Sequence, residues 1–173
     1  GEYCVVIGAG GLGHIAIQVL RAMCAAEIIV VDTSDASLQL AQECGADHLV
    51  KADGGEVEAI LSLTRGHGAE AVLDFVGERG TTSRGIAMTR NAGSYYVVGY
   101  GENISVPTID IVSTEINIIG NLVGSYNDLV ELMAEGVRTN RIDTVREEHS
   151  PEAMGRPARR DDHGGEVYVY RRH

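Results

Sequence analysis

The sequence predicts an α/β fold, in which a doubly wound parallel sheet of about six strands carries helices on both faces. Short apolar runs that end in glycine or an acidic residue alternate with stretches whose apolar residues recur at helical spacing. This alternation is typical of βαβ units, which form a parallel sheet covered by helices. The length of 173 residues suits one domain with a core and is too short for two full ones.

Six segments have the composition of buried strands, because each is a short apolar run bounded by turn residues. The first run ends in Gly8 and the second ends in Asp32. The six predicted strands span residues 3–8, 27–32, 48–51, 71–77, 94–101 and 116–123.

The helices between these strands are predicted from apolar periodicity and from end signals. Thr33, Ser34 and Asp35 are capping residues for the second helix, which Gly45 ends. The predicted helices span residues 12–23, 35–44, 57–65, 81–90 and 127–135.

The chain after Arg146 differs from the rest, because it is polar and has no clear helical or strand period. We therefore predict a nucleotide-binding domain over 1–146 and a divergent tail over 147–173, with one further strand at 166–170. Whether residues 147–165 are ordered is left open. Because Gly1 already begins a strand-like run, we expect the chain to be a piece of a longer protein.

The net charge of −11 argues against nucleic acid or an anionic membrane as a partner, since both attract clustered Lys and Arg. No apolar run is long enough to span a membrane, and no secretory signal is present, so a cytoplasmic location is expected. Lys51 is the only lysine. An acidic, lysine-poor composition fits either adaptation to high salt or ordinary acidic solubility, and both readings stay open.

The strongest motif is a glycine-rich turn between the first strand and the first helix. Residues 8–13, GAGGLG, satisfy G-x-G-x-x-G, which is weak alone and informative in this context. Gly8 permits the tight turn, Gly10 lets the backbone approach a pyrophosphate, and Gly13 lets the helix pack close to the strand. The helix N-terminus offers N–H groups to phosphates. The motif predicts a Rossmann-type dinucleotide site; a glycine turn without a ligand is the alternative.

Asp32 closes the second strand, 19 residues after Gly13 (32 − 13), close to the ~20 expected of the acid that binds the adenosine ribose. A carboxylate there accepts hydrogen bonds from the 2′-hydroxyl and repels a 2′-phosphate. The following Thr33 and Ser34 offer no positive charge to that phosphate, so NAD is favoured over NADP. The alternative role for Asp32 is a helix N-cap.

No catalytic constellation is visible in the sequence. His14 follows the glycine motif but is expected to face solvent, and Asp74 and Glu78 lie near a strand end without a base or ligand partner. Gly77, Gly99 and Gly124 fall at or just after strand ends, where ligands of open α/β sheets bind. The three cysteines have neither disulfide nor zinc spacing and are expected to be buried in a reducing compartment, namely Cys4, Cys24 and Cys44.

The chain resembles the coenzyme domain of the zinc-dependent medium-chain alcohol dehydrogenases, from Gly1 to about Glu135. The matching blocks occur in the family's order and are VVIGAGGLGHIAIQVL, VVDTS, CGADHLV, LTRGHGAEAVLDFVG, GSYYVVGYG and INIIGNLVGSYNDL. The resemblance implies the NAD(H)-binding domain of an oxidoreductase that transfers hydride between an alcohol and NAD.

The resemblance also implies roles by position. The pyrophosphate is held by the glycine turn, through Gly8, Gly10, Gly11 and Gly13, and the nicotinamide ring packs against Leu12 inside that turn. The ribose is bound by Asp32, and the fourth-strand segment beside the riboses is Phe75, Val76 and Gly77. The carboxamide is held by two later segments, Val98 and Gly99 with Asn121, Leu122 and Val123. It further implies a homodimer through the sheet edge at 104–120.

Departures from the family pattern are also informative. The family's catalytic domain, which carries the zinc ligands and the substrate pocket, is absent, so zinc is expected only there. A lysine that assists adenosine binding in the family is replaced near Ser37, and the sequence after Arg146 does not match the family's ending. These departures suggest a truncated or frame-shifted gene product.

Two other functions use a similar fold. A non-catalytic NAD-sensing or regulatory domain would share the cofactor site, although the sequence shows no partner-binding segment. An S-adenosylmethionine methyltransferase also has a glycine-rich first turn and an acid after the second strand, but the complete glycine motif and the nicotinamide-side blocks count against it. Fold alone does not decide among these functions.

Overall fold

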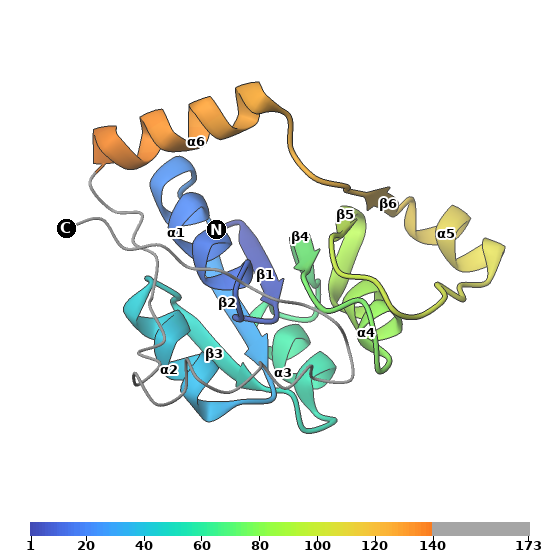
Figure 1. Ribbon diagram of the computed structural model, residues 1–173. Helices are drawn as coiled ribbons and strands as arrows, with labels where there is room; N and C mark the ends of the chain where they lie inside the picture. Colours follow the sequence, from blue (N-terminus) through green and yellow to red (C-terminus); the bar gives the residue numbers. More distant parts are fainter. Residues whose placement is uncertain (140–173) are drawn as a thin grey trace, which may run out of the picture.

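A computed structural model describes residues 1–139 and confirms the α/β fold (Figure 1). Six parallel strands form one sheet in the order β3-β2-β1-β4-β5-β6. Strand order reverses between β1 and β4, and ligands of such sheets bind beyond the carboxyl ends of the strands at this switch point. The strands are β1 (Tyr3–Ile7), β2 (Glu27–Asp32), β3 (His48–Lys51), β4 (Ala69–Asp74), β5 (Thr89–Val97) and β6 (Asn117–Gly120).

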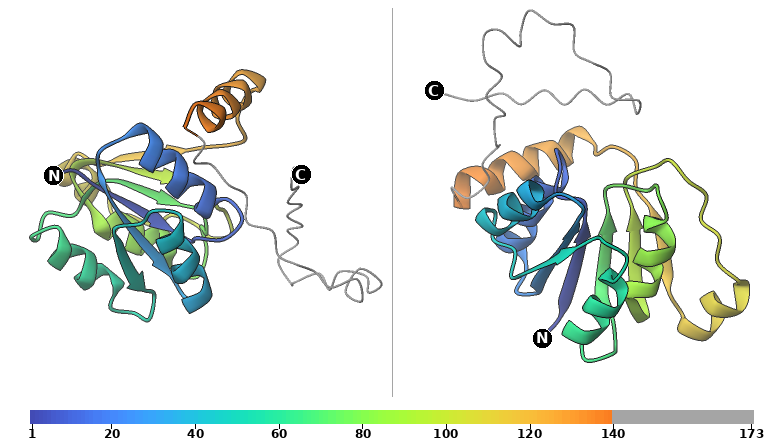
Figure 2. Two further views of the ribbon diagram at one scale, coloured as in Figure 1. Left: turned by 90° about the vertical axis from the view of Figure 1, so that its left-hand side faces the viewer. Right: turned by 90° about the horizontal axis from the view of Figure 1, so that it is seen from below.

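Helices cover both faces of the sheet, as Figure 2 shows from two sides. One face carries α1 and α2, and the other carries α3 and α4. The sixth helix lies beside α1 (Figure 1). The helices are α1 (Gly13–Met23), α2 (Asp35–Glu43), α3 (Glu56–Leu63), α4 (Thr81–Met88), α5 (Thr108–Thr114) and α6 (Tyr126–Thr139).

The core is aliphatic and divides into two clusters, one on each face of the sheet. Val5 and Ile7 of β1 pack into the cluster under α3 and α4, whereas Val6 between them packs with Ile17 of α1. This alternation follows from the period of two along a strand, and it explains why the buried strands are continuous apolar runs. Within residues 1–139, no helix combines the length and apolar character needed to cross a membrane.

Several element boundaries differ from the predicted ones. Helix α5 was not predicted, because it is only seven residues long, too short to show a clear helical period, and none of its residues is buried. Strand β6 ends at Gly120 rather than 123, and β5 begins at Thr89 rather than 94. The predicted boundary at 146 and the tail, including the strand at 166–170, lie outside the described residues.

The expectation that all cysteines are buried is wrong for one of them. Cys4 is buried in β1, and Cys44 is partly buried at the end of α2. Cys24 is exposed, because it follows the last residue of α1, where the helix leaves the sheet.

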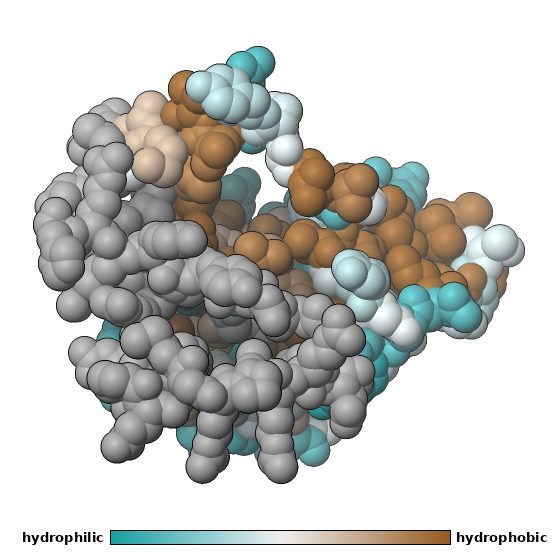
Figure 3. All heavy atoms as spheres, viewed as in Figure 1, coloured by the Kyte–Doolittle hydropathy of each residue, from teal (hydrophilic) through white to brown (hydrophobic). Residues whose placement is uncertain are grey.

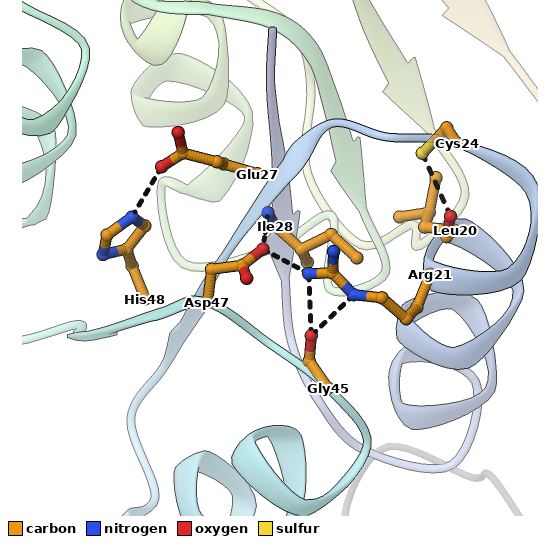
Figure 4. A network of polar contacts seen from close by, with 8 residues as sticks. All are labelled: Leu20, Arg21, Cys24, Glu27, Ile28, Gly45, Asp47 and His48. Atoms are coloured by element: carbon orange, nitrogen blue, oxygen red, sulfur yellow. Dashed lines mark hydrogen bonds and ion pairs between the residues drawn. The ribbon is translucent and has the colours of Figure 1, made fainter. Parts of the chain in front are cut away.

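A polar network joins the end of α1 to the start of β2 and β3 (Figure 4). Arg21 donates from Nε and Nη2 to the carbonyl oxygen of Gly45, at 3.0 and 2.9 Å, and also pairs with the Asp47 carboxylate. Asp47 in turn accepts a hydrogen bond from the N–H of Ile28, at 2.8 Å. Burial alone would raise the pKa of Asp47, but the hydrogen bonds from Ile28 and Arg21 and the charge of Arg21 hold it below its usual value.

Replacing Arg21 by leucine is expected to lower the free energy of unfolding by about 1 kcal/mol at pH 7. A carboxyl group with a lowered pKa in the folded state stabilises above its unfolded pKa, 3.8 for Asp47, and loses this contribution as the pH falls through the folded pKa. The difference between Arg21→Leu and the parent chain should therefore shrink below about pH 4. Urea unfolding at pH 7 and pH 3 measures it. In an Asp47→Asn background, the stability lost through Arg21→Leu should no longer depend on pH. A pH dependence that persists there would contradict the role given to the Asp47 carboxylate.

Candidate functional site

The glycine turn between β1 and α1 has the close packing that the motif predicts. Gly8 has a φ of +88°, and its N–H donates to the carbonyl oxygen of Val31, at 2.8 Å. A β-carbon on Gly13 would lie 1.8 Å from the carbonyl oxygen of Gly8, so only glycine allows the helix to begin this close to the strand. A β-carbon on Gly10 would meet nothing within 4 Å. The outer side of the turn is therefore open to a ligand.

Helix α1 presents its N-terminus at this open side. No side chain caps the helix, and its first turn contains no acidic residue. The positive end of the helix dipole is therefore not neutralised by the helix itself, which is the condition under which an N-terminus attracts an anion. Leu12, at the N-cap position, is 63% exposed beside the turn.

Asp32 fixes the glycine turn to the end of β2. Its Oδ2 accepts a hydrogen bond from the N–H of Ala9, at 2.8 Å, and its Oδ1 accepts one from the N–H of Ser34, also at 2.8 Å. The N-cap alternative for Asp32 is wrong, because Ser34 is the N-cap of α2 and accepts from the N–H of Ser37. Each carboxylate oxygen retains acceptor capacity for a further donor such as a ribose hydroxyl.

Asp74 organises the two loops that follow β4 and β5, a role that the sequence analysis missed. The side chain is fully buried. Its Oδ1 accepts hydrogen bonds from the N–H groups of Val76 and Gly77, at 2.8 and 2.9 Å, and its Oδ2 accepts one from the hydroxyl of Tyr95, at 2.7 Å. Burial, with the hydrogen bond to Asp74, raises the pKa of Tyr95, so the phenol keeps its proton and donates it.

The main chain of Asp74 joins the same two loops. Its carbonyl oxygen accepts hydrogen bonds from the N–H groups of Val98 and Gly99, both at 2.9 Å. Gly77 and Gly99 then touch backbone to backbone, because a β-carbon on Gly77 would lie 2.2 Å from the carbonyl oxygen of Gly99. These glycines thus have a packing role.

The structure brings some of the predicted site residues close to the glycine turn and leaves others apart from it. Gly8 lies against the β4 loop, since a β-carbon on it would lie 2.7 Å from the side chain of Val76 and 3.8 Å from that of Phe75. Asn121 joins the same edge through the hydrogen bond from its N–H to the carbonyl oxygen of Val97, at 2.8 Å. Leu122 and Val123 stand apart, because β6 ends before them and they are 91% and 88% exposed.

Two further side chains near the site differ from expectation. His14 was expected to face solvent, but it is buried. Its Nδ1 lies 2.8 Å from the carbonyl oxygen of Gly10, and its Nε2 has no hydrogen-bond partner within residues 1–139. Glu102, from the loop after β5, accepts from the N–H groups of Gly80 and Thr82 at the start of α4. This long-range cap has no local sequence signal and could not have been found by spacing.

The described residues do not form a metal site. Among residues 1–139, no three His, Cys, Asp or Glu side chains are grouped as metal ligation requires. The arrangement at the switch point instead combines an open glycine turn, a helix N-terminus and a carboxylate, which is the combination that holds a dinucleotide.

Comparisons with known proteins point to one family. The model of the family described as zinc-binding dehydrogenase matches residues 11–137. An NAD-dependent alcohol dehydrogenase of Sulfurisphaera tokodaii is 37% identical over 133 residues, which cover 75% of this chain and 38% of that protein. The chain thus spans about two fifths of the length of this relative.

Solved structures give the same result. The crystal structure of an alcohol dehydrogenase from Aeropyrum pernix is similar with a TM-score of 0.78 and 39% identity, over 80% of this chain and 40% of that one. The D-arabinose dehydrogenase of Sulfolobus solfataricus is similar with a TM-score of 0.74 and 28% identity, over 82% and 44%.

Replacing Asp74 by alanine is expected to lower the free energy of unfolding by about 3 kcal/mol, because it leaves two buried donors and one partly buried donor without an acceptor. Asp74→Asn should cost only about 1 kcal/mol, since the amide oxygen can accept from Val76 and Gly77 while its NH₂ donates to the Tyr95 oxygen. Chemical denaturation of both variants measures the difference. Equal losses would show that packing, rather than the hydrogen bonds, accounts for the contribution of Asp74.

Proposed function

The chain belongs to the zinc-binding dehydrogenase family, and on this basis we propose that it binds NAD(H) at the glycine turn and Asp32, as part of an enzyme that transfers hydride between an alcohol and NAD. The observation that carries the proposal is the open outer side of Gly10 at the switch point, with α1 aimed at it. The name of the Sulfurisphaera relative, an NAD-dependent alcohol dehydrogenase, supports the same cofactor.

Each part of the site has a task in this proposal. In the turn from Gly8 to Gly13, the backbone N–H groups of residues 10–13 donate to the pyrophosphate, since those of Gly8 and Ala9 already donate to Val31 and Asp32. Asp32 accepts hydrogen bonds from the ribose hydroxyls. Leu12 offers apolar surface to the nicotinamide ring. A bound nicotinamide supplies the hydride acceptor or donor, and the protein supplies binding and orientation.

The loops after β4, β5 and β6 complete the proposed site. Their backbone groups would border the riboses and the nicotinamide carboxamide, and the Asp74 network fixes two of the three loops before the cofactor arrives. Such preorganisation lowers the ordering cost of binding. The proposed residues here are Phe75, Val76, Gly77, Val98, Gly99, Asn121, Leu122 and Val123.

The zinc implied by the family does not fit the described residues, which lack a ligand group, so we derive no step through it. The NAD-sensing alternative is not favoured, because the similar proteins named above are dehydrogenases. A nucleotide-binding domain over 1–146, a cytoplasmic location and adaptation to salt remain proposals, the last supported by the net charge of −11 and the single lysine.

Fluorescence titration of the 173-residue chain with NADH and NADPH tests the cofactor site. We expect NADH to bind and NADPH to bind at least tenfold more weakly, because Asp32 repels the 2′-phosphate. Gly10→Val should weaken NADH binding by about tenfold or more at an almost unchanged melting temperature, since the new side chain fills the phosphate side and meets no protein atom.

Gly13→Ala is the matched control for this titration. It should instead lower the melting temperature, because its β-carbon would overlap the Gly8 carbonyl. Absence of NADH binding by the parent chain, or undiminished binding by Gly10→Val, would refute the proposed site.

We also propose that the chain forms a homodimer through the sheet edge at 104–120. Within residues 1–139, strand β6 has β5 as its single neighbour in the sheet, so no described strand pairs with its outer backbone groups. Ile109 and Val112 of α5 are 67% and 71% exposed, and Ile119 of β6 is 37% exposed. Figure 3 shows hydrophobic surface over this end of the molecule. An apolar patch beside a free strand edge is typical of an interface between subunits.

Val112→Glu is expected to shift the chain from dimer toward monomer, because it places a charge in the apolar patch. Sedimentation equilibrium over a range of concentrations measures this shift. The control is Met23→Glu, at the end of α1, which is equally exposed but distant from the edge. A parent chain that stays monomeric at high concentration, or an equal effect of both substitutions, would count against the proposed interface.

A further inference from the structure

The carboxyl ends of β2 and β3 bring the only lysine of the chain beside the proposed ribose-binding acid. The strand register pairs Lys51 with Asp32, and paired residues of neighbouring strands point to the same face of a sheet. Lys51 extends along this face and donates from Nζ to Oδ1 of Asp35, at 2.5 Å. Asp35 opens α2, three residues after Asp32.

This pairing determines the charge that a cofactor meets at its adenosine end. Three acidic residues follow the ends of the two strands closely in sequence: Asp32 ends β2, Asp35 begins α2, and Asp53 comes two residues after β3. Lys51 is the cation at the end of β3, and its charge is compensated by Asp35. A 2′-phosphate on the ribose would therefore approach a locally negative site, whereas two ribose hydroxyls carry no charge to be repelled.

We propose that Asp35 is a specificity-determining residue: it holds the ammonium group of Lys51 and thereby prevents it from compensating the 2′-phosphate of NADP. The inference rests on the proposed NAD(H) site. In this proposal, the exclusion of NADP depends on two aspartates that act in different ways. Asp32 faces the ribose, and Asp35 holds the neighbouring positive charge on α2.

The exposure of the pair makes the inference testable without loss of the fold. The side chains of Lys51 and Asp35 are 39% and 90% exposed, and exposed ion pairs contribute little to folding stability. A lysine side chain is also flexible over four carbons, so an ammonium group released from Asp35 can move to another anion within its reach. Asp35→Asn removes the charge and keeps the side-chain shape.

The experiment measures dissociation constants of NADH and NADPH for the parent chain, Asp35→Asn, Lys51→Met and the double variant. We expect Asp35→Asn to raise NADPH affinity relative to NADH by about two- to fivefold at low salt, with a smaller gain at higher salt. The gain should vanish in the Lys51→Met background, because no ammonium group is left to release. The same comparison with 2′,5′-ADP and 5′-AMP limits the readout to the adenosine end.

Asp53→Asn is the matched control, since it removes a carboxylate of the same region that bonds to the N–H of Gly55 rather than to Lys51. An equal gain with Asp53→Asn, or a gain that persists without Lys51, would overturn the inference in favour of general charge reduction. An unchanged NADPH-to-NADH ratio in Asp35→Asn would overturn it as well, while NADH binding by the parent chain would leave the proposed function standing. Failure of the parent chain to bind either dinucleotide would remove both.

Discussion

The close approach of backbone segments at the carboxyl ends of β1, β4 and β5 is the constraint on which the candidate site depends. Gly13 starts α1 against the carbonyl of Gly8, and Gly77 touches Gly99 with no room for a side chain on either. Because the contacts are between main-chain atoms, the outer side of the turn at Gly10 stays open, and the uncapped N-terminus of α1 lies beside it. That surface suits a phosphate-containing ligand.

Two carboxylates hold this arrangement together from different positions. Asp32 joins the glycine turn to the end of β2, and Asp74 joins the loops after β4 and β5. Asp32 is partly exposed and retains acceptor capacity, whereas Asp74 is fully buried and satisfied by three donors. The same residue type therefore leaves acceptors available to the proposed ligand in one place and serves internal order in the other, and the difference arises from exposure.

The sequence predicted the elements whose signals are local and left out those that depend on distant contacts. The buried runs of β1 and β2 and the turn at Gly8 follow from composition and spacing, so these parts agree with the structure. Asp74 lacked a visible partner in the sequence because Tyr95 is 21 positions away and meets it only through the pairing of β4 with β5. Helix α5 was missed because seven residues are too few to show a helical period, and His14 was misplaced because its ring turns back onto the Gly10 carbonyl.

The dependence of the β4 and β5 loops on main-chain contacts has an evolutionary consequence. Asp74 binds the N–H groups of positions 76, 77, 98 and 99, and these bonds do not require a particular side chain at 76 or 98. Substitutions at positions 76 and 98 can therefore change the side chains beside the site while the loop geometry stays the same. Substitutions at Asp74, Gly77 or Gly99 would be removed by selection for folding long before they could explore new ligands.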